Sequence, residues 1–314
     1  MERRTHPGGP GAGHTAGRAA PEPAPYEFVR APRRLGALVP STVGYRAAEE
    51  QPRLHRGLPS PYLTLVFSLD GPVVCGETPE HARGPDAYRA GVLFGGLHRT
   101  PAYIAQPARQ SGVQLALHPL AARALLGMPA AELNLTAVDG AALLGRGAAE
   151  LLERLQEQPE WEERFALLTG YLRDRVDRAA RRPGVRPGVR AEVAEAWRWL
   201  ARSGGAGPVD ALARHVALSP RQLGALFRRE VGMAPKQIAG LMRFERARGT
   251  IAASVAQGRP PDLADTAARC GFYDHSHLVR DFHRYTGLSP SGWIAEEHRN
   301  IQAGGHRNGE EWAP

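Results

Sequence analysis

The sequence is poor in several residue types that mark particular classes of protein. Only two cysteines occur among 314 residues, Cys75 and Cys270, which excludes a disulfide framework and fits a reducing, cytoplasmic compartment. Lys236 is the only lysine, so arginine supplies almost all of the positive charge behind the net +8. A basic chain favours an anionic partner, although the excess of Arg, Ala, Gly and Pro also fits a GC-rich bacterial genome.

Long apolar runs and catalytic motifs are also missing. No apolar stretch reaches the roughly 18 residues of a transmembrane helix, so we expect no membrane span. Residues 1–25 are mostly Gly, Pro, Ala, His and Arg without the apolar core of a signal peptide, and we expect a disordered tail. A second flexible tail is expected at 299–314. No nucleophile elbow, phosphate-binding glycine loop or His-Glu-x-x-His motif occurs, so neither catalysis nor a cofactor is expected.

Residues 60–118 carry the signals of β-strands. The expected strands lie at 62–69, 73–75, 92–94, 103–104 and 113–117. Asp70-Gly71 is a hairpin-type pair, which makes Val73-Val74-Cys75 the candidate return strand. In the last strand Val113 and Leu115 alternate with Gln114, as in a strand with one buried face.

The pattern then becomes helical. Helices are expected at 120–126, 141–155 and 161–176, the last with one apolar face that packs either on its own sheet or on a second copy of the chain. Residues 181–190 contain two Pro-Gly pairs and read as a linker. We therefore predict an α+β protein: a small sandwich-like or barrel-like β domain with helices at 26–180, and an all-helical domain at 191–298.

The C-terminal region contains a repeat. Residues 219–235 and 274–290 lie 55 positions apart and share apolar residues and terminators. The matching pairs are Leu223 and Leu278, Phe227 and Phe282, Gly232 and Gly287, and Pro235 and Pro290. A short helix precedes each copy, at 209–216 and 263–269. Two copies of one helix-turn-helix are therefore predicted.

Each copy has the start and stop signals of a helix. Ser219 and Asp274 are expected N-caps, and glycines supply left-handed stops at the far ends. Ala213 and Ala267 match at a spacing of 54, so the second turn should be one residue longer. Residues 236–254 between the copies predict a connecting helix about 30 Å long. That length is close to the roughly 34 Å between successive major grooves on one face of DNA.

These features resemble the DNA-binding domain of the AraC/XylS family of transcription regulators. The resemblance covers 191–298 and is closest over Leu263–Pro290, which contains the turn Gly271-Phe272-Tyr273 and the cap Asp274. Residues 26–180 resemble, more distantly, an uncharacterised N-terminal domain of some members. The resemblance implies double-stranded DNA as partner and an N-terminal domain that senses a small molecule or forms a homodimer. An activator would also contact RNA polymerase.

The family pattern also implies which side chains meet DNA. The expected base contacts are Arg221, Gln222, His275, Ser276, His277 and Arg280. The expected phosphate contacts are Arg228, Arg229, Lys236 and Arg284. Gly224 and Ala225 occupy the positions of Val279 and Arg280 and cannot hydrogen-bond a base through a side chain. The second unit is therefore expected to read more of the sequence than the first.

Three alternative hypotheses accompany this assignment. Cys270, His275, His277 and His283 cluster in the sequence but lack the ligand spacing of a zinc site, so no metal is predicted there. In the N-terminal domain, Cys75 is a candidate thiol sensor, and His55, His98 and His118 are candidate metal ligands. The third alternative is a protein-interaction module with weakened DNA binding. The preferred prediction is a sequence-specific, non-enzymatic DNA-binding regulator.

Overall fold

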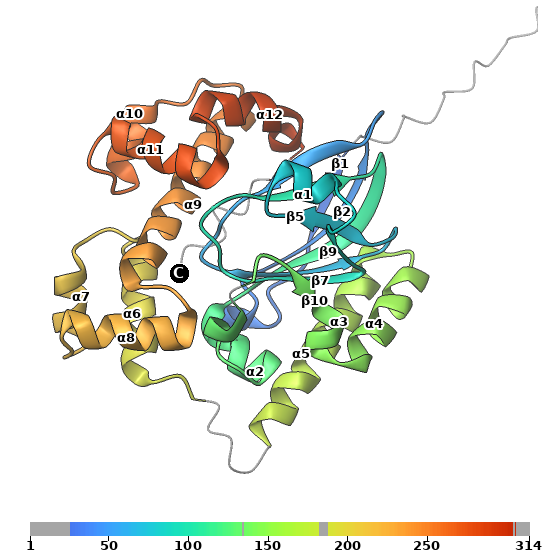
Figure 1. Ribbon diagram of the computed structural model, residues 1–314, viewed down its shortest axis with the longest axis horizontal. Coiled ribbons are helices and arrows are strands. Elements are labelled where there is room, and N and C mark those ends of the chain that lie inside the picture. Colours follow the sequence, from blue (N-terminus) through green and yellow to red (C-terminus); the bar gives the residue numbers. More distant parts are fainter. Residues whose placement is uncertain (1–25, 134, 182–187, 304, 306–314) are drawn as a thin grey trace, which may run out of the picture.

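The computed structural model describes residues 26–133, 135–181, 188–303 and 305, and Figure 1 shows their arrangement. The predicted tail at 1–25, much of the predicted tail at 299–314 and most of the predicted linker, 182–187, lie outside these residues, while 299–302 are the last residues of a helix. Strands gather in the N-terminal half, and the C-terminal half is helical throughout its described part. The predicted α+β class, with a two-sheet domain followed by an all-helical region, is confirmed.

Two antiparallel sheets form the N-terminal half. The six-stranded sheet has the order β1 (Tyr26–Arg30), β2 (Ser41–Ala48), β9 (Arg109–Leu117), β4 (Leu63–Ser68), β7 (Val92–Gly95) and β10 (Val138–Asp139). The four-stranded sheet has the order β3 (Arg53–Gly57), β8 (Ala102–Gln106), β5 (Val73–Gly76) and β6 (Tyr88–Ala90). The connections place a 3-10 turn η1 (Gly36–Leu38) and a helix α1 (Pro79–Arg83) beside them.

One expected hairpin is wrong. The segment Val73–Gly76 does not return alongside β4, because β4 already pairs with β7 on one side and β9 on the other. Gly71, at φ +94°, turns the chain, and β5 crosses to the four-stranded sheet, where it pairs with β6 and β8. The turn signal was local and correct, but strand pairing depends on which neighbours are free.

Helices cover one face of the six-stranded sheet. They are α2 (Ala122–Leu126), α3 (Gly140–Leu144), α4 (Arg146–Glu157) and α5 (Trp161–Ala180), with 3-10 turns η2 (Pro119–Ala121) and η3 (Ala130–Leu133). Gly145, at φ +83°, divides the helix expected at 141–155 into α3 and α4. Leu63, Leu65 and Phe67 of β4 are fully buried on this face. Phe165 and Leu168 of α5 belong to the same core, so this helix packs within its own chain.

The C-terminal half contains seven helices in its described residues: α6 (Ala191–Arg202), α7 (Val209–His215), α8 (Pro220–Val231), α9 (Pro235–Ala256), α10 (Leu263–Arg269), α11 (His275–Thr286) and α12 (Pro290–Gln302). The long helix α9 has one helix-turn-helix unit near each end (Figure 1). Trp197 of α6 packs against His118 with ring centroids 4.8 Å apart. Apolar packing is continuous from the sheet into these helices.

None of the described helices is both long enough and apolar enough to cross a membrane.

Candidate nucleic-acid interface and interdomain cavity

The first helix-turn-helix unit consists of α7 and α8. Its turn places Ala217 at φ +54°, the single non-glycine residue with positive φ in the described chain. The Leu218 N–H then donates to Ala213 O at 3.0 Å. Ser219 caps α8: Gln222 N donates to Ser219 Oγ at 3.2 Å, and Ser219 N donates to Gln222 Oε1 at 3.0 Å. This reciprocal pair is a capping box, which satisfies two backbone N–H groups at the helix start.

The second unit, α10 and α11, repeats this arrangement. Gly271, at φ +78°, makes the turn, and the Phe272 N–H donates to Ala267 O at 3.0 Å. Tyr273 follows before the cap, so this turn is one residue longer, as predicted. Asp274 then accepts from His277 N at 2.6 Å. Both recognition helices end on left-handed glycines, Gly232 in α8 and Gly287 in α11.

Helix α9 holds the two units in a fixed relation. Arg243 Nη1 donates to Gly205 O at 2.6 Å, beside the first unit, while its guanidinium lies 5.7 Å from the Phe272 ring of the second. Phe244 packs against Phe282 and Tyr285 at centroid distances of 5.1 and 4.9 Å. Trp293 of α12 closes the same core at 1% exposure. Buried aromatic packing of this kind resists relative motion of the elements it joins.

The predicted base-contacting residues fall into two groups. Arg221, His275, Ser276 and Arg280 are exposed on the outer faces of their helices. The side chain of Gln222 is held in the capping box. His277 Nδ1 accepts from Tyr273 N at 3.3 Å, Nε2 lies 3.6 Å from Asp281, and the ring packs on Phe272. The side chains of Gln222 and His277 are therefore held in local contacts at the starts of the two recognition helices, and their contact with bases stays a prediction.

The four predicted phosphate-contacting side chains are all exposed: Arg228, Arg229, Lys236 and Arg284. Arg284 lies 3.1 Å from Asp281 and Arg229 lies 3.6 Å from Glu230. In both pairs the arginine is exposed while the carboxylate is buried, so a DNA phosphate would have to compete with a buried carboxylate for the arginine.

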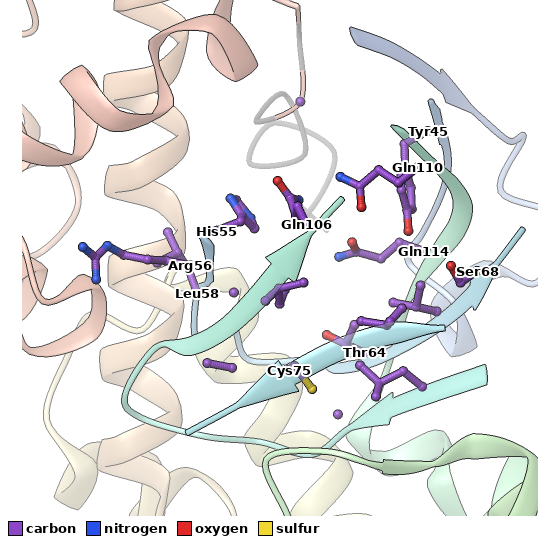
Figure 2. Close-up of a pocket in the computed structure, with 18 of the residues that line it drawn as sticks. Tyr45, His55, Arg56, Leu58, Thr64, Ser68, Cys75, Gln106, Gln110 and Gln114 are labelled. Atoms are coloured by element: carbon purple, nitrogen blue, oxygen red, sulfur yellow. The ribbon is translucent and has the colours of Figure 1, made fainter. Parts of the chain in front are cut away.

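A cavity of about 290 Å³ lies between the two sheets and reaches the C-terminal helices (Figure 2). Its polar lining includes Tyr45 of β2, Thr64 and Ser68 of β4, and Gln110 and Gln114 of β9. Gln114 is exposed although its neighbours Val113 and Leu115 are fully buried. Alternate residues of β9 therefore lie on opposite faces of the sheet: Val113 and Leu115 face the covering helices, and Gln114 faces the cavity.

The C-terminal half supplies one wall of this cavity. Glu245 and Arg248 of α9 and Asn300 of α12 are among the lining residues. Glu245 is 5% exposed and pairs with Arg248 through Oε1. Its other oxygen, Oε2, and the hydroxyl of Tyr26 are buried without a hydrogen-bond partner among the described residues. Buried polar groups are nearly always satisfied, so ordered water or a bound molecule is expected to pair with these two atoms.

Strand β3 connects the cavity to α12. His55 Nδ1 lies 3.1 Å from Glu297, and Arg56 Nε donates to Glu296 at 2.9 Å. In Figure 2 the Arg56 side chain extends away from the cavity toward the C-terminal helices. Arg53, on the same strand, donates to Gln106 at 3.0 Å. The cationic side chains of this strand are thus already paired.

Three of the candidate sensor residues, His55, Cys75 and His98, line the cavity, and His118 lies outside its lining. Burial raises the pKa of the Cys75 thiol to about 11, which keeps it protonated and poorly reactive at neutral pH. Burial lowers the pKa of His118 to about 4 and also lowers the pKa of His98. His118 contacts Tyr62 and Trp197, whereas His55 lies on the cavity wall. Across the described ranges, no three His, Cys, Asp or Glu side chains are grouped for a metal.

Comparison with known proteins identifies the C-terminal region. Residues 212–296 match a family model described as a helix-turn-helix domain. No curated protein matches the chain.

Several solved structures show a distant likeness. ToxT from Vibrio cholerae, as an apo variant, is 10% identical, with 81% of this chain and 97% of that chain covered and a TM-score of 0.49. ToxT with a bound unsaturated fatty acid is 8% identical, with 81% and 94% covered and a TM-score of 0.43. The C-terminal domain of AraT, a response regulator from Geobacillus stearothermophilus, is 18% identical, with 34% and 87% covered and a TM-score of 0.30.

The matched family segment contains α8 to α11 together with their caps, turns and stops. Residues 212–296 are therefore a helix-turn-helix domain, a motif that places its second helix in the major groove of DNA.

Proposed function

We propose that this chain is a non-enzymatic, AraC-type transcription regulator that places α8 and α11 in successive major grooves of DNA. The two helices have equivalent caps and stops and pack at opposite ends of α9. With 22 residues, α9 is about 33 Å long. Successive major grooves on one face of B-DNA are about 34 Å apart, so this spacing suits simultaneous binding.

The two helices would read DNA unequally. Arg280 on α11 can donate two hydrogen bonds to guanine O6 and N7, with His275 and Ser276 beside it. On α8 the matching positions are Gly224 and Ala225, which leaves Arg221 as the long exposed side chain near the helix start. The first unit would therefore mainly anchor the backbone through Arg228, Arg229 and Lys236, which position the protein without reading bases.

A base-by-base binding scan tests this division. The full chain would first select its site from a random DNA pool, and each base pair would then be changed in turn. Changes under α11 should each cost about 1–3 kcal/mol, and Arg280→Ala should remove discrimination at one of them. The matched change Arg221→Ala should have a smaller effect. Stronger discrimination under α8 would contradict the proposal.

We further propose that a small molecule in the cavity controls DNA binding. The supporting observation is that both parts of the chain line the cavity. Gln114 comes from the β domain, and Glu245 comes from α9, the helix that joins the two helix-turn-helix units. A molecule that contacts both would stabilise one relation between the two parts. At about 290 Å³ the cavity lies near the lower end of the range for small-molecule sites, roughly 300–1,000 Å³.

The lining favours an uncharged, hydrogen-bonding molecule. The amide side chains Gln110 and Gln114 and the hydroxyls of Thr64, Ser68 and Tyr26 offer both donors and acceptors. The arginines of β3, Arg53 and Arg56, are paired with Gln106 and Glu296, so an anionic ligand would have to displace an existing contact. Glu245 Oε2 would accept a hydrogen bond from a ligand hydroxyl or amide.

Coupling to DNA would pass through the contacts between the two parts. Arg123 of α2 donates to both oxygens of Glu230 on α8, at 2.9 and 3.2 Å. Arg56 contacts Glu296, and Arg299 contacts Glu49 at 3.3 Å. A ligand that shifts β3 or α9 therefore changes how α8 and α12 are held.

The cavity proposal can be tested by thermal denaturation of the full chain. The probes are two matched sets, neutral sugars such as ribose and glucose, and straight-chain carboxylates such as octanoate. A neutral probe should raise the melting temperature and change affinity for the selected DNA site. Gln114→Leu should abolish both effects, whereas the control Gln158→Leu, at a half-buried residue outside the cavity lining, should abolish neither. Stabilisation by carboxylates alone, lost in Gln114→Leu, would contradict the proposed ligand chemistry.

The remaining parts of the proposal concern organisation. We assign residues 26–180 to ligand sensing and 191–298 to DNA binding, joined by 181–190. Helix α5 buries its apolar face against its own chain, which favours an intramolecular role over dimerisation for that face. Homodimerisation through another surface, contact with RNA polymerase by an activator, and a cytoplasmic location stay predictions.

A further inference from the structure

We propose that Tyr273 donates a hydrogen bond from its hydroxyl to a DNA phosphate, beside the base-reading face of α11. This inference rests on the proposed insertion of α11 into a major groove. Tyr273 is 93% exposed, against 39% for Tyr88 and 57% for Leu135, the other exposed large apolar side chains in the described residues. Such exposure in the middle of a well-packed unit needs a reason.

Tyr273 has no counterpart in the first unit. The equivalent hydrogen bonds Leu218 N to Ala213 O and Phe272 N to Ala267 O show that Leu218 and Phe272 occupy the same structural position. Ser219 follows Leu218 directly as the cap of α8. In the second unit Tyr273 stands between Phe272 and the cap of α11. The longer turn therefore adds one residue, and that residue is aromatic.

The ring has no packing role in the fold. A residue just before an N-cap often packs against the fourth residue of the helix, here Leu278. Leu278 is fully buried while Tyr273 remains exposed, so the Tyr273 ring is not what covers it. Phe272, at 6% exposure, fills the core position of the turn. Folding therefore gains little from this side chain.

The backbone nevertheless fixes where Tyr273 stands. Its N–H donates to His277 Nδ1 at 3.3 Å, and the next residue, Asp274, caps the helix at 2.6 Å. His275 and Ser276 follow at the exposed start of α11. In helix-turn-helix proteins this end of the recognition helix meets the bases. A residue just outside it lies where the strand backbone borders the groove, and tyrosine hydroxyls commonly contact phosphates there.

The test compares Tyr273→Phe with the wild-type full chain by fluorescence anisotropy. Two probes are used, the DNA site selected from a random pool and a mixed-sequence duplex that lacks it. Tyr273→Phe should weaken binding to both duplexes by a similar factor, about tenfold for a lost hydrogen bond to a charged group. The dependence of log affinity on log salt should keep its slope, because the lost group is uncharged. Arg284→Ala, by contrast, should reduce that slope by about one phosphate contact.

Tyr88→Phe on β6 is the matched control and should bind like the wild type. Because Tyr273 is exposed, Tyr273→Phe should not change the melting temperature. Wild-type affinity in Tyr273→Phe would overturn the inference, and a loss seen only in Tyr273→Ala would show that the ring contacts DNA instead. With either result, Arg280→Ala should still lose selectivity, which would leave the proposed insertion of α11 intact and contradict only the role of Tyr273. If the proposed function itself were wrong, the wild-type protein would show no salt-dependent DNA binding.

Discussion

The first helix-turn-helix unit turns on Ala217 at φ +54°, and the second turns on Gly271 at φ +78°. Both turns lead to a side-chain cap, a buried Leu and Phe pair, and a left-handed glycine stop. Their outer faces differ: α11 presents Arg280 where α8 has Ala225, and Tyr273 has no equivalent. Residues that build the helices are thus repeated, while residues that face outward are free to differ because no packing constrains them.

Substitution of the buried residues should give the largest change in stability, and it tests whether the two units are equivalent. Phe227 and Phe282 are both fully buried in matching positions. Truncation of either to alanine leaves a cavity and should lower the free energy of unfolding by about 3–5 kcal/mol. Urea denaturation of the two variants measures this directly. Losses that differ by more than about 2 kcal/mol would show that the two scaffolds are not equivalent.

Acid should affect the two units differently. His118 has a pKa of about 4 and packs on Trp197 of α6, which lies beneath the first unit. An unfolded histidine takes up its proton near pH 6.5, so the unfolded state binds more protons between pH 6.5 and 4. Stability is therefore complete above pH 6.5 and falls as the pH drops toward 4, with a loss of about 2 kcal/mol between pH 7 and 5.

Urea titrations at these two pH values, with hydrogen exchange to locate the change, measure this effect. Exchange should rise first in α6 and around His118. The His118→Gln variant removes this titrating group and should lose most of the dependence. A variant that keeps the full dependence would assign it to other groups, of which His98 is one because burial also lowers its pKa.

The two turn residues give the smallest expected effect. A Cβ on Gly271 would lie 3.0 Å from Ala206 Cβ and would require a left-handed backbone at a residue with a side chain. Gly271→Ala should therefore cost about 1 kcal/mol or more. Ala217→Gly removes the strain of a left-handed backbone but increases the conformational entropy of the unfolded chain. Its net effect on the free energy of unfolding should therefore be close to zero. Thermal denaturation of both variants compares them; equal destabilisation would mean that the two turns carry no difference in strain.

The β domain allows a second comparison, between the strands that the sequence pattern indicates and the surroundings that the folded chain gives them. The alternation around Gln114 correctly indicated a strand with one buried face. It could not indicate that the polar face borders a cavity shared with the C-terminal helices. The same limit explains β5, whose turn was recognisable but whose partners were not.

The sequence by itself determined the repeated helices, because helix starts and stops depend on contacts between residues a few positions apart. Ser219, Asp274, Gly232 and Gly287 act in this way, and each stands where the repeat placed it. Only the tertiary structure decided that Tyr273 is left exposed and that Glu245 shares a cavity with Gln114. These arrangements depend on segments far apart in the chain, whose approach is set by packing of the whole molecule and leaves no local pattern.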